Sequence, residues 1–410
     1  MDVLHDRVAG LDVHKKTVMV CVRTPGEGRQ RRAEVREFET FTGDLEHMRD
    51  WLAVEGVTHI AMEATGVYWK PVWFVLEDLE VELLLVNARH VRMVPGRKTD
   101  VKDAAWLAEL LEVGLLRSSF VPDPVIRQLR DLTRYRKRLT QDRTREGQRV
   151  EKVLEDAGIK LGSVASQTLG VSGRSMLDAL IAGERDPVVL ADMSLKVLRR
   201  KRPELQRALV GRFNDHHARM LKLLLAHIDY LDVMIVELDD QIEAQIAPFA
   251  EQVVRWQTVP GVGRVGAQVL VAEFGPDMSI FPTAAHAGSW AGVAPGNNES
   301  AGKQRSGRTN HANPWLADAL VQAAWAASRT KQTWLRARFW RLARRIGRKK
   351  ALIATAHSIV IAGWHMHTNR VDYQDLGENW WDDRAGRDET ERLVRRLQQL
   401  GNRVTLEHVA

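Results

Sequence analysis

Thr99-Asp100-Val101-Lys102-Asp103 stands at the head of a predicted helical run that continues Ala-Ala-Trp-Leu-Ala-Glu-Leu-Leu. Two carboxylates three residues apart at a helix start lie on one face, about one turn apart. Acidic residues in a first turn are also common as caps and as partners of the helix dipole. The stretch therefore gains a functional meaning only from carboxylates elsewhere in the chain.

Two strand-like segments near the N-terminus form a predicted hairpin. Val8-Ala-Gly-Leu-Asp12-Val-His is the first strand, Lys15-Lys16 the turn, and Thr17-Val-Met-Val-Cys-Val22 the second strand. Asp12 thus lies within an apolar strand, where a charge is costly unless a partner or a metal ion neutralises it.

Three further strands and intervening helices complete the predicted N-terminal domain. The strands are Glu34 to Thr40, Thr58 to Gly66 and Val81 to Val86, and Glu63 lies near the end of the second of these. Strands that alternate with helices are typical of an α/β layered domain, in which ligands gather at strand ends.

The four carboxylates could converge at such an edge: Asp12, Glu63, Asp100 and Asp103. Carboxylates brought together repel one another unless a cation neutralises them. Oxygen ligands without a His or Cys cluster favour Mg²⁺ or Mn²⁺. Two such ions suit attack at a phosphodiester.

Composition limits the class of protein. The chain has 410 residues, of which 44% are hydrophobic, and a net charge of +7, which favours a polyanionic partner. Its single cysteine, Cys21, excludes a disulfide framework and a cysteine-based zinc site. We find neither a signal-peptide pattern nor an apolar run long enough to span a membrane, so we expect a cytoplasmic protein without a membrane partner.

The middle of the chain is predicted to be helical and basic. Arg127 to Lys152 has a large excess of arginine, including Arg134 and Arg138, which suits either a phosphate-tracking surface or a solvated helix face. A long helix is predicted from Asn214 to Phe249, folded as a coiled coil on the basic helix or pairing subunits. Its predicted heptad-like positions are Met220, Leu224, His227, Leu231, Met234, Leu238, Ile242 and Ile246.

A glycine turn opens the C-terminal part. Val259-Pro-Gly261-Val-Gly263 before a helical run indicates a helix-hairpin-helix, in which backbone N–H groups of the turn approach phosphate. A plain tight turn between two helices is the alternative.

Trp290 to Asn313 is a long polar stretch with two serines, Ser300 and Ser306, and with Lys303, Arg305 and Arg308. Basic groups beside a serine would stabilise charge on an attacked phosphate, although a flexible loop has the same composition. Asn313 is predicted to cap a helix whose first residue is Pro314.

The last basic segment, Arg329 to Lys350, contains ten basic residues and no acid, interleaved with aromatic residues. It is the strongest local indication of nucleic-acid binding, with Arg338, Arg341 and Arg345 as candidate contacts. The acidic, tryptophan-rich segment from Asp372 to Glu391 could fold onto this basic surface or stay mobile.

Three motifs carry a family resemblance: G-L-D-V-H-K, A-M-E-A-T-G and K-T-D-V-K-D-A, in this order. They resemble the DEDD-motif insertion-sequence transposases, which include the pilin-gene invertase and the bridge-RNA-guided recombinases. The resemblance implies a RuvC-like (ribonuclease H type) N-terminal domain. It also implies that Asp12, Glu63, Asp100 and Asp103 form a metal-binding tetrad.

The resemblance extends to the C-terminal part through aromatic-x-G-x-x-P, then S-x-G with basic residues, then N-P-W-L. It implies a transposase domain with a nucleophilic serine just after the proline. Ser300 best matches that position, but Ala301 interrupts the expected Ser-Gly pair and Ser306 is the competitor. No His-Asp pair suited to activating a serine is evident, so we expect the metal to activate it.

These observations predict a DNA recombinase that forms a phosphoserine link, with DNA ends and target as partners. The resemblance implies a bridge RNA, and transposition implies a homodimer or homotetramer at the bacterial nucleoid. The predicted regions are 1–125 (metal-binding), 126–250 (helical), 251–370 (serine domain) and 371–410 (tail). The alternatives are a metal-dependent Holliday-junction-type nuclease without a covalent intermediate and a non-enzymatic DNA-binding protein.

Overall fold

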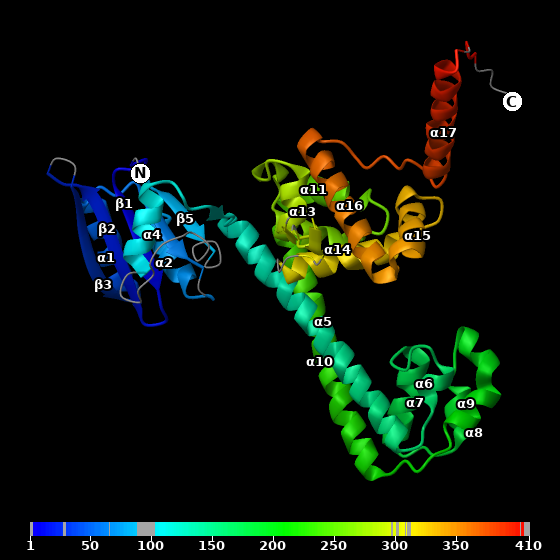
Figure 1. Cartoon of the computed structure of the whole chain (residues 1–410). Coiled ribbons are helices and arrows are strands. Elements are labelled where there is room, and N and C mark those ends of the chain that lie inside the picture. The colour runs from blue at the N-terminus through cyan, green and yellow to red at the C-terminus, as the bar shows by residue number, and fades with distance from the viewer. Residues whose placement is uncertain are drawn as a thin grey trace. The chain divides into compact units, whose positions relative to one another are not determined.

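The computed structural model describes residues 3–27, 30–64, 66–87, 103–296, 298–300, 303–307, 309, 313–401 and 403–405. The chain forms two compact units, Met1–Pro122 and Asp123–Ala410 (Figure 1). None of the helices in these residues has the length and apolar character needed to cross a membrane.

The first unit contains a six-stranded sheet in the order β3-β2-β1-β4-β5-β6, which confirms the predicted α/β class. The first three strands form antiparallel pairs, whereas β1, β4 and β5 run parallel. The strands are β1 (Val8–Val13), β2 (Thr17–Pro25), β3 (Arg31–Glu39), β4 (His59–Glu63), β5 (Glu82–Val86) and β6 (Ser118–Ser119).

Helices cover both faces of this sheet. The helices α1 (Thr42–Val54) and α2 (Trp69–Leu76) share a core with Ala9, Leu11 and Val13 of β1. On the other face, α4 (Asp103–Glu112) shares a core with Val8 of β1 and with Ala61 of β4. Because side chains alternate along a strand, Gly10 and Asp12 belong to the α4 face, and so does Glu63.

Gly10 lets α4 settle directly on β1. A Cβ atom at this position would lie 2.2 Å from the carbonyl oxygen of Ala104 and 2.4 Å from the amide nitrogen of Ala108. Both atoms belong to the helix backbone, so a side chain could be accommodated only by moving the helix. The glycine therefore sets the height of α4, and with it the position of Asp103, above the sheet.

In its described residues, the second unit is helical apart from one small hairpin (Figure 1). Its helices are α5 (Pro124–Asp156), α6 (Leu161–Val164), α7 (Val171–Ala182), α8 (Pro187–Asp192), α9 (Arg202–Ala208), α10 (Asp215–Ile246), α11 (Ala250–Gln257), α12 (Arg264–Phe274), α13 (Ala284–Trp290), α14 (Pro314–Ala327), α15 (Trp334–Ile346), α16 (Arg348–Asn369) and α17 (Trp380–Gln399). The hairpin strands are β7 (Asn298–Ser300) and β8 (Lys303–Ser306).

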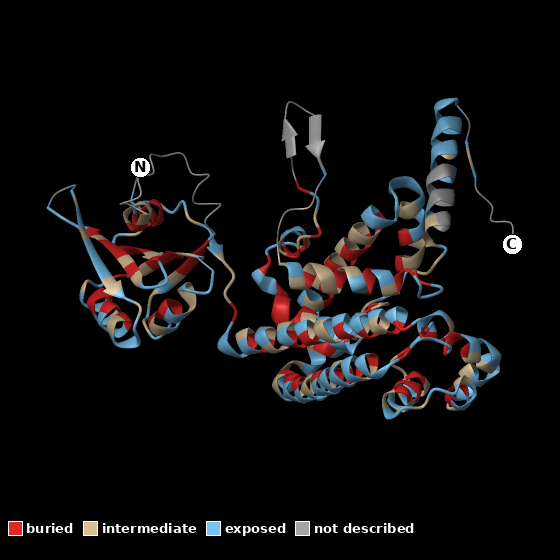
Figure 2. Ribbon diagram, turned by 90° about the horizontal axis from the view of Figure 1, so that it is seen from below, coloured by how far each residue is buried: buried red, intermediate tan, exposed pale blue. Residues whose placement is uncertain are grey.

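The long helices α5 and α10 pack lengthwise and antiparallel. Arg136 of α5 pairs with Asp239 of α10. Arg143, seven residues further along α5, pairs with Asp232, which lies seven residues before Asp239 on α10. The two helices carry a lobe, residues 157–214, which contains α6 to α9. Figure 2 shows buried residues along the contact between the long helices.

The predicted contact positions on α10 are correct only in its C-terminal half. Leu231, Leu238, Ile242 and Ile246 are buried, but at the other end the buried residues are Leu221, Leu225 and Ile228. The predicted Met220 is 37% exposed, and His227 is also exposed. The difference arises because this end of α10 packs into the core of the lobe as well as against α5.

We expect Gly10→Ala to lower the local unfolding free energy of the first unit by roughly 2 kcal/mol, because the added methyl overpacks the contact with α4. Amide hydrogen exchange of peptides from β1 and α4 measures this loss. Gly43→Ala in α1 is the control, since nothing lies within 4 Å of its added Cβ. Equal protection in the two variants would contradict the assigned role of Gly10.

Candidate functional site

In the first unit, carboxylates gather at the end of two adjacent parallel strands. Leu11 of β1 pairs with Met62 of β4, so the next residues, Asp12 and Glu63, occupy neighbouring positions on the α4 face. Asp103 is the first residue of α4, directly before Ala104, which contacts β1 at Gly10. Three of the four predicted carboxylates therefore belong to one edge of one face.

The surroundings of Asp12 suit an oxygen ligand. Its carboxylate is 19% exposed, and Oδ2 lies 3.0 Å from Nε2 of His14, whose ring is largely in solvent. Asp100 lies outside the described residues. Within the part of the chain that is described, no group of three His, Cys, Asp or Glu residues is close enough to hold a metal ion. The carboxylate set has the donor chemistry of a Mg²⁺ or Mn²⁺ site, and the tetrad itself stays a prediction.

In the second unit, the polar stretch predicted as a long loop contains the β7–β8 hairpin. Ser300 pairs with Lys303 beside the turn, whereas Ser306 pairs with Asn298 at the other end of the strands. An isolated bridge between Pro295 and Thr309 lies beyond that end. Only the backbone of these strands is described, and Arg308 lies outside the described residues. The two candidate serines thus occupy opposite ends of the hairpin.

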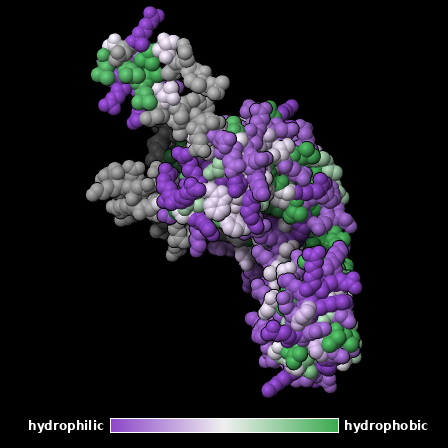
Figure 3. Space-filling view, turned by 90° about the vertical axis from the view of Figure 1, so that its right-hand side faces the viewer, coloured by the Kyte–Doolittle hydropathy of each residue, from purple (hydrophilic) through white to green (hydrophobic). Residues whose placement is uncertain are grey.

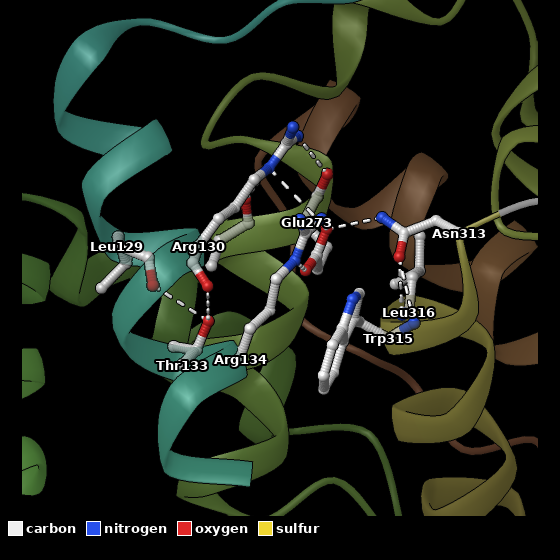
Figure 4. Close-up of polar contacts among 9 residues, drawn as sticks. Leu129, Arg130, Thr133, Arg134, Glu273, Asn313, Trp315 and Leu316 are labelled. Atoms are coloured by element: carbon white, nitrogen blue, oxygen red, sulfur yellow. Dashed lines mark hydrogen bonds and ion pairs between the residues drawn. The ribbon is translucent and has the colours of Figure 1, made fainter. Parts of the chain in front are cut away.

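The hairpin leads into α14, whose first turn is held by a buried carboxylate (Figure 4). Asn313 caps the helix as predicted, accepting hydrogen bonds from the amides of Trp315 and Leu316. Its Nδ2 donates to Oε2 of Glu273 at 2.5 Å. Glu273 belongs to α12 and is fully buried.

Arginines from α5 neutralise this carboxylate. Nε and Nη2 of Arg134 donate to the two oxygens of Glu273 at 2.7 and 2.8 Å. Arg130 donates to the carbonyl oxygens of Ala272 and Glu273 at 2.7 and 2.6 Å. Burial lowers the pKa of Arg130 to about 10, against the opposing effect of Glu273. These contacts join α5, α12 and the start of α14.

Sequence analysis missed Glu273. The available signal was its place as the only acid in the apolar run Ala267 to Phe274. A charge in such a helix is tolerated only with buried partners of the opposite sign, and the neighbouring arginine-rich helix supplies them.

The predicted phosphate contacts on α5 differ in their surroundings. Arg134 is engaged by Glu273, whereas Arg138 is exposed, with its guanidinium 5.4 Å from the centre of the Trp315 ring. Much of the remaining positive charge of α5 is paired within the unit: Lys137 with Asp318, Arg143 with Asp232, Arg145 with Asp142 and Arg149 with Glu146.

The two glycines of the turn between α11 and α12 have different reasons for being glycine. Gly261 has a φ of +91°, and a Cβ atom there would lie 2.4 Å from the carbonyl oxygen of Ala323 in α14. Gly263 is exposed and has nothing within 4 Å of an added Cβ. Both line an open groove between α5, the turn and α14. Gly261 thus serves packing, and Gly263 leaves the end of α12 accessible.

The basic helix α15 is partly covered by Glu378 and by the start of α17. Arg336 pairs with Glu378, and the ring of Trp381 stacks on that of Trp334 at 5.7 Å. Arg338 lies over both rings, and burial lowers the pKa of its guanidinium. The part of the acidic segment that contains Glu378 and Trp381 therefore folds onto α15. This was one of the two alternatives predicted for the segment.

Two further candidate contacts on α15 remain accessible. Arg341 lies over the ring of Trp381 at 5.4 Å, yet is exposed, and Arg345 is also exposed.

We expect Glu273→Gln to lower the unfolding free energy of the second unit by roughly 3 kcal/mol, because it leaves buried arginine charge without its counterion. Urea denaturation of the full chain, with amide exchange in α12 and α14 to locate the loss, measures the change. Glu237→Gln on α10 is the control, since this glutamate is exposed. A loss no larger than that of the control would contradict the role of Glu273.

Two family models and one named protein are similar to this chain. Residues 9–159 match a family model described as "Transposase", of the DEDD type of IS110, and residues 255–340 match the model "Transposase IS116/IS110/IS902 family". A protein of Sinorhizobium fredii named "Putative transposase y4pF/y4sB" is 25% identical over 333 residues, which cover 77% of this chain and 74% of that protein. The first match contains the carboxylate edge and the second contains the serine hairpin and Glu273, and on these grounds the chain belongs to the IS110 family of transposases.

Proposed function

We propose that this protein cuts and rejoins DNA through a covalent link between a serine and a DNA phosphate, in a reaction that depends on a divalent metal ion. The observation that carries the proposal is the carboxylate edge: Asp12 and Glu63 end adjacent parallel strands, and Asp103 begins the helix that packs over them. A fold that serves only to bind DNA has no need of such repelling charges on one face.

The carboxylates would hold the metal. Asp12, Glu63, Asp100 and Asp103 offer only oxygen ligands, which Mg²⁺ and Mn²⁺ prefer. When bound, such an ion supplies positive charge next to the reacting phosphate. Without it, the carboxylates of this edge would repel the DNA backbone.

Ser300 is the proposed nucleophile. Its oxygen attacks phosphorus, the P–O bond to one deoxyribose breaks, and the displaced sugar oxygen gains a proton while the serine loses one. The resulting phosphoserine ester keeps the energy of the broken bond, so attack by another DNA end can rejoin the strands without an external energy source. Ser300 lies beside the hairpin turn, a position that suits contact with an incoming backbone better than that of Ser306.

Basic residues near the serine would bind the phosphate during this step. Lys303 and Arg305 belong to β8, and Arg308 follows it. Arg138, Arg341 and Arg345, which are exposed, would contact DNA further away. Gly263, at the open end of α12, would let backbone amides approach phosphate.

We also infer two partners. A noncoding bridge RNA would pair with target and donor DNA, because the resemblance is to RNA-guided recombinases and the chain is basic. A homodimer or homotetramer would hold two DNA sites together. Neither partner is needed for the proposed chemistry at a single phosphate.

Covalent capture tests the mechanism. Full-length protein, Mg²⁺, labelled element-junction DNA and RNA transcribed from the flank of the element are incubated and separated by denaturing electrophoresis. We expect a protein–DNA adduct that falls by more than about a thousandfold in Ser300→Ala, and that is lost in Asp12→Asn and on chelation of the metal. Ser306→Ala should keep the adduct.

The other outcomes are equally specific. Loss in Ser306→Ala with survival in Ser300→Ala would move the nucleophile to Ser306. DNA cleavage without any adduct would replace the proposal with a junction-type nuclease. Metal-independent binding without cleavage, unchanged in Asp12→Asn, would leave a DNA-binding protein.

A further inference from the structure

The lobe carries a dense cluster of positive charge that the proposed chemistry does not use. Lys196-Val-Leu-Arg-Arg-Lys201 forms a 3₁₀ helix between α8 and α9, and Arg202 follows it. We call Lys196–Lys201 the basic turn. None of its residues is buried, and the sequence from Lys196 to Arg202 contains no acidic residue. The cluster lies between the two segments matched by the family models, outside both.

The basic turn is anchored at its ends and free in between. Before it, the amide of Leu195 donates to Oγ of Ser172 at 2.9 Å. At its end, Nζ of Lys201 donates to the carbonyl oxygen of Val164, and Arg202 pairs with Asp192. Among the described residues, no hydrogen bond or ion pair engages the side chains of Lys196, Arg199 or Arg200.

This freedom contrasts with α5, where much of the positive charge has a carboxylate partner in the same unit. Like charges on one short turn repel, and the fold gains nothing from their side chains. Val197, which lies between Lys196 and Arg199 in the sequence, is 72% exposed, and the contact of its apolar side chain with water does not stabilise the fold. In Figure 3 most of the surface of the lobe that faces the viewer is hydrophilic, with separate hydrophobic side chains. The basic turn is therefore a preformed surface whose missing partner is an anion.

We propose that the basic turn binds the phosphodiester backbone of a nucleic-acid duplex, at a distance from the reacting phosphate. Lys196, Arg199 and Arg200 present three free cations on one short turn, which can contact neighbouring phosphates of a strand, whereas a single small anion would engage fewer of them. Along α5 the lobe lies roughly 40 Å from the level of Arg130, at 1.5 Å per residue. The inference rests on the proposed action on DNA and adds a second backbone contact to it.

The test is the salt dependence of binding. We expect Lys196→Gln/Arg199→Gln/Arg200→Gln in the full chain to weaken binding to a duplex of about 30 base pairs roughly tenfold. The slope of log K against log salt, measured by fluorescence anisotropy between about 50 and 200 mM, should fall by about 2 to 3. At saturating DNA the yield of covalent adduct should stay at the wild-type level, since the turn is remote from the hairpin.

A matched variant separates a local contact from general charge. Arg207→Gln/Arg212→Gln/Arg219→Gln removes the same charge from exposed positions of the lobe and α10 that are not clustered. We expect it to change the slope by less than about 1. An equal loss in both variants, or an unchanged slope in the first, would overturn the proposal. Circular dichroism would verify that both variants keep their helices.

Parallel titrations with a DNA duplex and a base-paired RNA of equal length identify the source of the phosphates. If the first triple variant loses affinity for only one duplex, the basic turn binds that nucleic acid. If it loses affinity for both, the basic turn contacts the phosphate backbone of either. Anionic lipid vesicles bound in place of either duplex would overturn the proposal. If the wild-type protein bound neither duplex, the proposed action on DNA would fail, whereas wild-type binding that the first variant leaves unchanged overturns only this inference.

Discussion

The second unit depends on one buried negative charge. Glu273 is fully shielded from water and would be costly without its partners, so its presence requires Arg134 at both of its oxygens and a further polar neighbour at Oε2. Asn313 fills that role and at the same time caps α14. A single carboxylate thereby sets the relative positions of α5, α12 and α14.

Charge is used in two opposite ways within the same unit. On α5, cations form ion pairs with acids of α10, α12 and α14. Much of the charge that suggested a nucleic-acid surface in the sequence therefore stabilises the packing of this unit. On the basic turn, and at Arg345 of α15, cations remain in solvent. Positive charge in a sequence therefore indicates a polyanionic partner only where the cations are not already paired with acids of the same protein.

Which cations are paired within the fold could not be predicted from the sequence. The apolar run from Val8 to Val13 was enough to predict the strand that carries Asp12. The β7–β8 hairpin was not predictable in this way, because Asn-Glu-Ser and Lys-Gln-Arg-Ser contain no apolar residue whose period could indicate a strand. The shifted contact residues of α10 have another cause: periodicity gives a helix face, but it does not reveal that a lobe packs on one half of it.

The two candidate sites share a physical device. In the first unit, Asp103 begins α4, and α4 rests on Gly10 with its backbone so close that a Cβ would lie 2.2 Å from a helix carbonyl. In the second, Asn313 caps α14, and α14 rests on Gly261, where the same distance would be 2.4 Å. In each case backbone meets backbone beneath the helix, at the first turn of α4 and at the last turn of α14. Rotamer freedom in an intervening side chain would loosen the placement of the helix, and reactions at phosphorus demand that it be tight.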